Sequence, residues 1–175
     1  MQSLKERMIR AAKLEVGLYE EVEADKEALG QAMMVVVISS VAAGIGAIGT
    51  IGFKGLIFGT IIALVSWFIW AYLTYIIGTK LLAEPQTKAD LGELLRTIGF
   101  SSSPGVLRIF AIIPMLGHIL NLVCGIWMLV AMVIAVRQAL DFKSTWRAVG
   151  VCLIGFIIQL IVFAIFFQSF GNPGA

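Results

Sequence analysis

Hydrophobic positions dominate this chain from residue 33 to residue 170, where apolar runs alternate with short polar segments. Four of the runs approach or reach the roughly 20 residues that an α-helix needs to cross about 30 Å of bilayer core, whereas the third is only about 16 Å long as a helix. In chain order the runs are Met33–Phe53, Leu56–Ile77, Val106–Leu116, Ile119–Val136 and Val149–Phe170. This pattern predicts an all-α integral membrane protein.

The segment before the first run predicts a helix outside the membrane, because apolar residues recur along one face of residues 3–29. Its charges are polarised, with a mainly basic first half and a mainly acidic second half. Two interpretations stay open. In one, the basic half rests on anionic lipid while the acidic half recruits a basic partner. In the other, the two halves form charge pairs within a solvated helix.

A second helix outside the hydrocarbon is predicted at about residues 88–100, between the second and third runs. Leu91, Leu94 and Leu95 recur on one face, and Arg96 lies on the opposite, polar side. This amphipathic pattern is typical of a helix that lies along the membrane interface. We therefore expect these four residues, together with Arg108, to form part of a cytoplasmic interface.

The distribution of lysine and arginine indicates how many runs cross the bilayer. If the short third run crosses, the chain makes five passes, and all but one of its 13 basic residues lie on one side, Lys54 being the exception. If that run re-enters instead, Arg137, Lys143 and Arg147 change sides. The positive-inside rule favours five crossings, with a cytoplasmic N-terminus and an external C-terminus. Arg108 would then snorkel to the cytoplasmic headgroups.

The predicted architecture is therefore an N-terminal cytoplasmic amphipathic helix at residues 1–30, a five-helix membrane domain at 31–170 and an external tail at 171–175. The expected spans are about 32–53, 56–79, 104–116, 118–138 and 146–169. A third span this short must be shielded by its neighbours or must thin the bilayer locally. Small residues such as Ala42 and Gly46 allow close helix packing, which we expect inside one chain, with a homo-oligomer as the alternative.

Composition and charge narrow the class of partner. With 59% hydrophobic and 14% charged residues, a soluble domain of 175 residues could not bury its apolar surface, whereas lipid can solvate it. The net charge of +2 and the lack of a basic patch argue against nucleic-acid binding. The lipid bilayer is the expected partner, and a protein partner is expected only at the cytoplasmic face.

The sequence contains no motif for catalysis, metal binding or phosphate binding. His118 is the only histidine, and Cys124 and Cys152 lie inside apolar runs, where buried thiols are expected. We therefore expect no enzymatic activity, no metal and no cofactor.

Three polar side chains interrupt the apolar runs at a similar depth. At about 1.5 Å per residue, Ser66, Asn121 and Gln159 come out roughly 20–25 Å from the cytoplasmic ends of their helices. We expect Asn121 and Gln159 to bond to neighbouring helices and to stabilise their packing. A solute pathway is the alternative, but no carboxylate lies at this depth to couple transport to an ion.

Four segments carry a resemblance to a known family: Tyr75–Lys80, Ala89–Gly105, Val136–Phe142 and Thr145–Gly150. Over about residues 15–168 the chain resembles a bacterial member of the Yip family of small polytopic membrane proteins, named for interaction with Ypt/Rab GTPases. The resemblance implies a five-span domain with a cytoplasmic N-terminus, in a bacterial cytoplasmic (inner) membrane. In eukaryotic members it implies a role in vesicle trafficking and GTPase recruitment, and it supplies no site residue.

Together these features predict a non-enzymatic membrane protein that organises the membrane or partner proteins through a cytoplasmic face made by residues 3–29 and 87–100. Two other functions stay open. One is a small solute transporter, channel or lipid-handling protein that uses the level of Ser66, Asn121 and Gln159. The other is an accessory subunit of a larger membrane complex.

Overall fold

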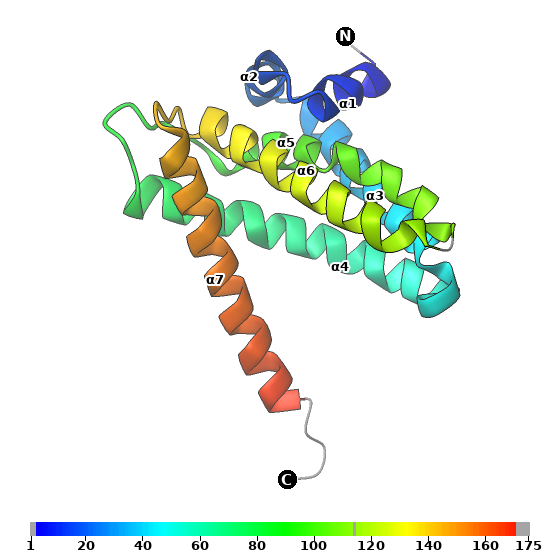
Figure 1. Ribbon diagram of the computed structural model, residues 1–175. Coiled ribbons are helices and arrows are strands. Elements are labelled where there is room, and N and C mark those ends of the chain that lie inside the picture. The colour runs from blue at the N-terminus through cyan, green and yellow to red at the C-terminus, as the bar shows by residue number, and fades with distance from the viewer. Residues whose placement is uncertain (1–2, 114, 171–175) are drawn as a thin grey trace.

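The computed structural model describes residues 3–113 and 115–170, with side chains as far as residue 162. Every regular element in these ranges is helical, which confirms the predicted all-α class (Figure 1). The elements are α1 (Leu4–Ala12), α2 (Val16–Ala24), α3 (Ala28–Gly46), α4 (Ile48–Ile76), η1 (Ile77–Leu81), α5 (Leu91–Ser101), η2 (Ser103–Ile112), α6 (Leu116–Ala139) and α7 (Thr145–Phe170).

Four helices of the described ranges are long and apolar enough to cross a membrane. They are Ala28–Gly46, Ile48–Leu81, Leu116–Ala139 and Thr145–Val162. Large apolar side chains point outward along them, such as Phe53 and Phe58 of α4, which are 71% and 64% exposed. Lipid can solvate such side chains, so the outer surface fits a multi-pass membrane protein.

The chain reverses direction between α3 and α4 within very few residues. α3 ends at Gly46, and Ala47 connects it to α4. Gly52 then has a φ of 63°, a left-handed conformation that glycine adopts without strain, and it kinks the first turns of α4. The first span therefore ends earlier than the predicted residue 53.

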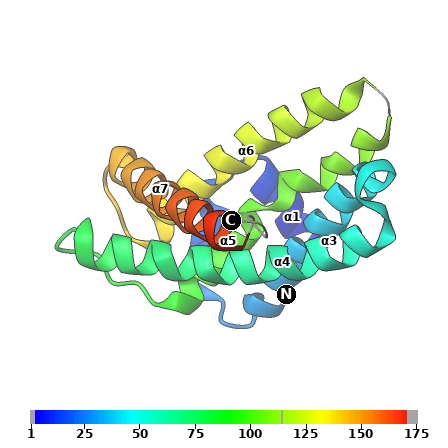
Figure 2. The ribbon, with the colours of Figure 1, turned by 90° about the horizontal axis from the view of Figure 1, so that it is seen from below.

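The chain between η1 and α6 differs from the predicted short third span. α5 and η2 follow one another in the same direction, and α6 returns beside them (Figures 1 and 2). At about 1.5 Å per residue in an α-helix and about 2.0 Å in a 3₁₀-helix, the two elements together measure roughly 36 Å. η2 is therefore the second half of a longer rod, which is long enough to match a bilayer core.

Helix α5 is covered by other helices, whereas its pattern predicted a polar face open to water at the membrane interface. Residues 94–101 are all buried inside the protein, and α5 packs against α2, α3, α4 and α6. The amphipathic pattern is real, but both of its faces are covered, since α2 lies over the polar side. This correction explains why Phe100, at the end of the helix, is also fully buried.

The single helix predicted at residues 3–29 is incorrect, because this range contains α1, α2 and the first two residues of α3. Leu14 has a φ of 61° and separates α1 from α2. α1 then lies against η2 and α5, while α2 lies against α5 and α6. Because the turn folds one helix beside the other, Ala11 of α1 and Leu18 of α2 are both fully buried. A straight helix of this length, roughly 40 Å, could not place both apolar stripes on the same bundle.

Helix α7 leaves the bundle at a steep angle (Figures 1 and 2). It contacts α6 through the connecting turn, and α4 and η1 along its first half. Gly155 marks this contact, because a Cβ atom placed there would lie 3.4 Å from the ring of Trp70. Beyond it, Phe156 and Leu160 are exposed.

Candidate functional site

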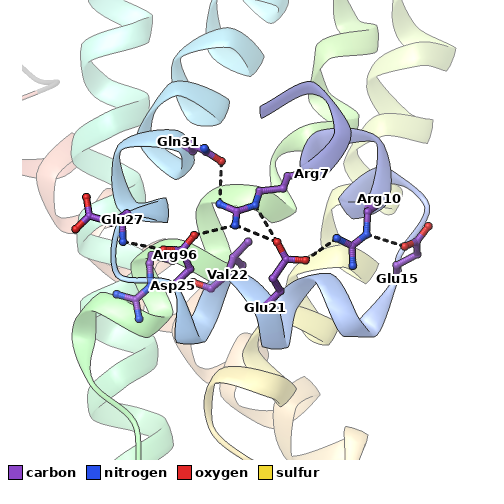
Figure 3. A network of polar contacts seen from close by, with 9 residues as sticks. All are labelled: Arg7, Arg10, Glu15, Glu21, Val22, Asp25, Glu27, Gln31 and Arg96. Carbon is purple, nitrogen blue, oxygen red and sulfur yellow. Dashed lines mark hydrogen bonds and ion pairs between the residues drawn. The ribbon is translucent and has the colours of Figure 1, made fainter. Parts of the chain in front are cut away.

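Arg7 of α1 is the centre of a network of hydrogen bonds and ion pairs between the N-terminal helices (Figure 3). The Arg7 side chain is only 6% exposed and donates hydrogen bonds to three acceptors. Its Nε donates to Glu21 Oε1 at 3.1 Å, its Nη2 to Asp25 Oδ2 at 2.8 Å, and its Nη1 to Gln31 Oε1 at 3.0 Å. One guanidinium therefore joins α1 to α2, to the turn that follows α2, and to α3.

A second arginine extends this network to the turn between α1 and α2. Arg10 Nη1 donates to Glu21 Oε2 at 2.6 Å, and Arg10 Nε donates to Glu15 Oε2 at 3.0 Å. Burial opposes ionisation of Glu21, but the hydrogen bonds from Arg10 and Arg7 outweigh it and lower the pKa of this carboxyl. Of the two sequence interpretations of residues 3–29, the structure bears out charge pairing, now between two helices.

Arg96 of α5 donates hydrogen bonds to the last turn of α2. It is 5% exposed. Its Nε donates to the Val22 carbonyl at 2.9 Å, and its Nη2 donates to the Glu23 carbonyl. Carbonyls in the last turn of a helix lack partners within the helix, and a cation placed there also interacts favourably with the helix dipole. α5 itself begins with a capping box, in which Asp90 and Glu93 exchange hydrogen bonds of 2.8 Å.

The loop between η1 and α5 is bonded to the turn between α6 and α7 and to the first turn of α7. Glu84 carries most of this connection, with an ion pair of 3.0 Å to Arg147 and a hydrogen bond of 3.1 Å from the Lys143 backbone. Gln86 adds a hydrogen bond of 3.1 Å to the Asp141 carbonyl. The loop and the turn therefore form one polar end of the bundle.

A small polar cavity of about 560 Å³ opens between α2 and this end of the bundle. The residues that line it are Glu20, Glu23, Ala24, Glu93, Arg137, Gln138, Asp141 and Phe142. The pKa of Glu23 is raised to about 7, first by burial and then by the carboxylates of Glu93, Asp141 and Glu20, while Arg96 opposes the shift. Among the residues that the structure describes, no group of three or more His, Cys, Asp or Glu side chains is placed to hold a metal ion.

The sequence of the chain is similar to one known protein family over most of its length. The family profile of the Yip1 domain matches residues 18–166. The chain belongs to the Yip1 domain family. This confirms the resemblance seen in the sequence, and the family is non-enzymatic. No curated protein and no solved structure gives a significant match to the chain.

The Yip1 domain begins within α2, so α1 lies outside the matched residues. Arg7 therefore attaches a helix that precedes the domain to acceptors inside it, whereas Arg96 makes contacts within the domain. Trp127 of α6 adds another attachment, because its Nε1 donates to the Ala12 carbonyl at 2.7 Å.

The structure brings together two of the three intramembrane polar residues. Ser66 of α4 and Gln159 of α7 line one large cavity of the Yip1 domain. Asn121 lies on an exposed face of α6, away from that lining. The side chains of Asn121 and Gln159 make no hydrogen bond within residues 3–113 and 115–162, so the expected bonds to neighbouring helices are absent from this part of the chain.

The five predicted interface residues have different environments. Leu94, Leu95 and Arg96 are buried inside the domain, and Leu91 is half-buried. Arg108 lies in η2, with its main chain close to Gly46 at the end of α3. Because α5 precedes η2 in the same rod, Arg108 lies in the second half of that rod and not at its start, where the sequence predicts it to reach the cytoplasmic headgroups.

Sequence reasoning missed the residues that attach the N-terminal helices. Arg7 and Glu21 are 14 positions apart, and Arg96 and Val22 are 74 positions apart. No helical periodicity connects positions at these separations. The only signal in the sequence was the basic first half and the acidic second half of residues 3–29. It indicated that charges pair, but it did not indicate which residues pair with each other.

Glu23 is expected to make the stability of the Yip1 domain depend on pH. A raised carboxyl pKa means that the folded state favours the protonated form, so stability falls as pH rises from about 4.5 to about 7. Changing Glu23 to glutamine should raise the melting temperature at pH 8 by about 2–4 °C and change it little at pH 5. The charged groups that face Glu23 are Glu20, Glu93, Arg96, Arg137 and Asp141.

The measurement is thermal unfolding of the purified protein in detergent at both pH values. Glu27→Gln is the matched control, since Glu27 is exposed and lies outside the cavity. An equal difference between Glu23→Gln and the parent at pH 5 and pH 8 would contradict the assignment.

Proposed function

We propose that this Yip1 domain protein is a non-enzymatic scaffold of the bacterial cytoplasmic membrane, which organises partner proteins at a polar platform. The platform consists of α1, α2, the loop 82–90 and the turn 140–144. The observation that carries the proposal is the attachment of α1 and α2 to the membrane helices through Arg7 and Arg96. A surface that is ordered before binding loses less conformational freedom when a partner docks.

The surface of the platform supports a polar partner. Lys5, Lys13, Glu20, Lys26 and Glu27 are exposed on or beside the two N-terminal helices. Most apolar residues of α1 and α2 face the bundle instead, with Leu18 and Val22 fully buried, while Ile9 and Val16 are 45% and 44% exposed. A partner would therefore meet charged side chains on a rigid support.

Charge reversal on the platform tests the proposal. Glu20→Lys combined with Glu27→Lys should reduce recovery of a stoichiometric partner in native purification at least tenfold. Lys54→Glu is the control, because Lys54 is an exposed charge on α4, outside the platform. Equal recovery from the parent, the double variant and the control would reject the scaffold. It would instead favour an accessory subunit bound through the lipid-facing helices.

We also propose five crossings, with the N-terminus inside, the C-terminus outside and α5 with η2 as the third pass. The combined length of roughly 36 Å and the asymmetry of basic residues support this topology. Met115, at the turn before α6, is 92% exposed and would face the outside. Lys88, before α5, would face the cytoplasm.

Labelling of single cysteines tests the topology, with Cys124 and Cys152 replaced by alanine. In intact cells a membrane-impermeant maleimide should label Met115→Cys and leave Lys88→Cys unlabelled, while both should react after lysis. If Met115→Cys reacts only after lysis, the third pass does not cross.

A further inference from the structure

Two buried nitrogen atoms of the Yip1 domain have no hydrogen-bond partner. They are Nε of Arg108 and Nε1 of Trp70, and no other buried side-chain nitrogen or oxygen of the described residues lacks one. Buried N–H groups are almost always paired, because leaving one unpaired costs free energy. Both residues line the same cavity, so both point to an acceptor that the protein itself does not supply.

The cavity is large and its lining is mostly apolar. Its volume is about 1000 Å³, at the upper end of the range of small-molecule sites. Leu129 of α6, and Leu153 and Phe156 of α7, line the cavity and are also more than half exposed on the outer surface. The cavity is therefore accessible from the side that faces lipid.

Among the residues whose side chains are described, Arg108 is the only charged one that lines the cavity, and none of the lining residues carries a carboxylate. An arginine side chain stays protonated in proteins, so burial does not remove its charge. A cation in such surroundings requires an anion nearby. Hydroxyl groups that could assist an anion come from Ser39 and Ser102, which share the lining, whereas Ser40 and Ser101 already donate to the carbonyls of Val37 and Ile98.

We propose that this cavity binds one anionic phospholipid, with the phosphate at Arg108 and an acyl chain along the apolar walls of α4, α6 and α7. A free phosphate would leave these walls without a partner. A zwitterionic lipid would not neutralise the cation. Arg108 holds the headgroup in preference to Trp70, because only the guanidinium carries charge.

Two glycines of α4 provide a matched test of the cavity itself. Gly59 lines it, and a Cβ atom placed on Gly59 meets no protein atom within 4 Å. Gly49 is equally free of neighbours but lies outside the lining. Gly59→Leu therefore fills the cavity without disturbing the fold, and Gly49→Leu adds the same side chain elsewhere.

The experiment is titration of the delipidated full-length protein with phosphatidylglycerol, followed by native mass spectrometry. Arg108→Gln and Gly59→Leu should each weaken binding about tenfold or more, since a charge-assisted hydrogen bond or the volume for the chain is lost. Lys54→Gln and Gly49→Leu should stay within about twofold of the parent, and Trp70→Phe should weaken binding less than Arg108→Gln, because the indole N–H carries no charge. Arg108→Lys should bind more tightly than Arg108→Gln.

Phosphatidylcholine, oleate and inorganic phosphate are titrated in parallel and should bind at least tenfold more weakly. Tighter binding of any of these three would overturn the proposal, as would parental affinity in both Arg108→Gln and Gly59→Leu. A loss in Trp70→Phe equal to that in Arg108→Gln would also overturn it, because the headgroup would then lie elsewhere. Gel filtration of each variant separates lost binding from lost folding.

Discussion

Replacing Gly46 with leucine is expected to lower the melting temperature by about 6–12 °C, which corresponds to roughly 3 kcal/mol for a chain of this size. Gly46 is the last residue of α3, where this helix meets η2. A Cβ atom placed there would overlap the carbonyl oxygen of Arg108 and lie 3.0 Å from the Cβ atom of Ala111. Main-chain atoms cannot rotate away, so α3 and η2 would have to separate.

Other glycines provide controls of graded severity. Gly49→Leu should have little effect, because no atom lies within 4 Å of a Cβ atom placed on Gly49. Gly105→Ala should have an intermediate effect, since the atoms it meets belong to the side chains of Ser39 and Met128, which can shift. Thermal unfolding in detergent measures all three. If Gly46→Leu melted at the same temperature as Gly49→Leu, the close contact of α3 with η2 would be wrong.

The long helices were predictable because the bilayer restricts what an apolar run can become. A run of about 20 apolar residues has to form a helix, since no other segment satisfies its backbone in hydrocarbon. The candidate spans at Leu116–Ala139 and Thr145–Val162 follow directly from this rule. The boundary between the first two helices was less predictable, because Gly46, Gly49 and Gly52 all permit a turn and only packing selects one.

The environment of α5 could not be read from its pattern. An amphipathic helix shows that one face is polar, but the pattern does not say whether water or another helix covers that face. The interfacial prediction assumed water around Arg96, whereas its partners are the Val22 and Glu23 carbonyls. The turn at Leu14 was also unpredictable, because the residues between α1 and α2 include no glycine or proline that would indicate a turn.

The candidate cavity was partly visible in the sequence. Ser66 and Gln159 were identified from their depth, and both line it. Asn121 has a similar computed depth but lies on another side of its helix, and a depth estimate contains no information about rotation. The position of Arg108 depended on recognising that α5 and η2 form one rod, which hydropathy alone does not reveal because the first half is too polar.

Exchanging Arg7 for methionine is expected to free α1 from the Yip1 domain while the membrane helices stay folded. Removing one partner of a buried ion pair typically costs about 3–5 kcal/mol. Glu21 and Asp25 are each 30% exposed, so water reduces the loss to about 2 kcal/mol. This value corresponds to roughly a 30-fold increase in the population of detached α1.

Hydrogen exchange of the α1 amides measures this release, with the amides of α4 as the internal reference. Lys5→Met is the matched control, because Lys5 lies on the same helix, is exposed and makes no ion pair among those found in the described residues. The hydrogen bond from Arg7 lowers the pKa of Asp25, so its contribution is complete above the ordinary value of 3.8 and is lost as pH falls below it. The parent should therefore release α1 in acid, whereas the Arg7 variant should already be released at neutral pH. Equal exchange of α1 in the Arg7→Met and Lys5→Met variants would show that the apolar contacts of Ala11 and Met8, and not the guanidinium, hold this helix.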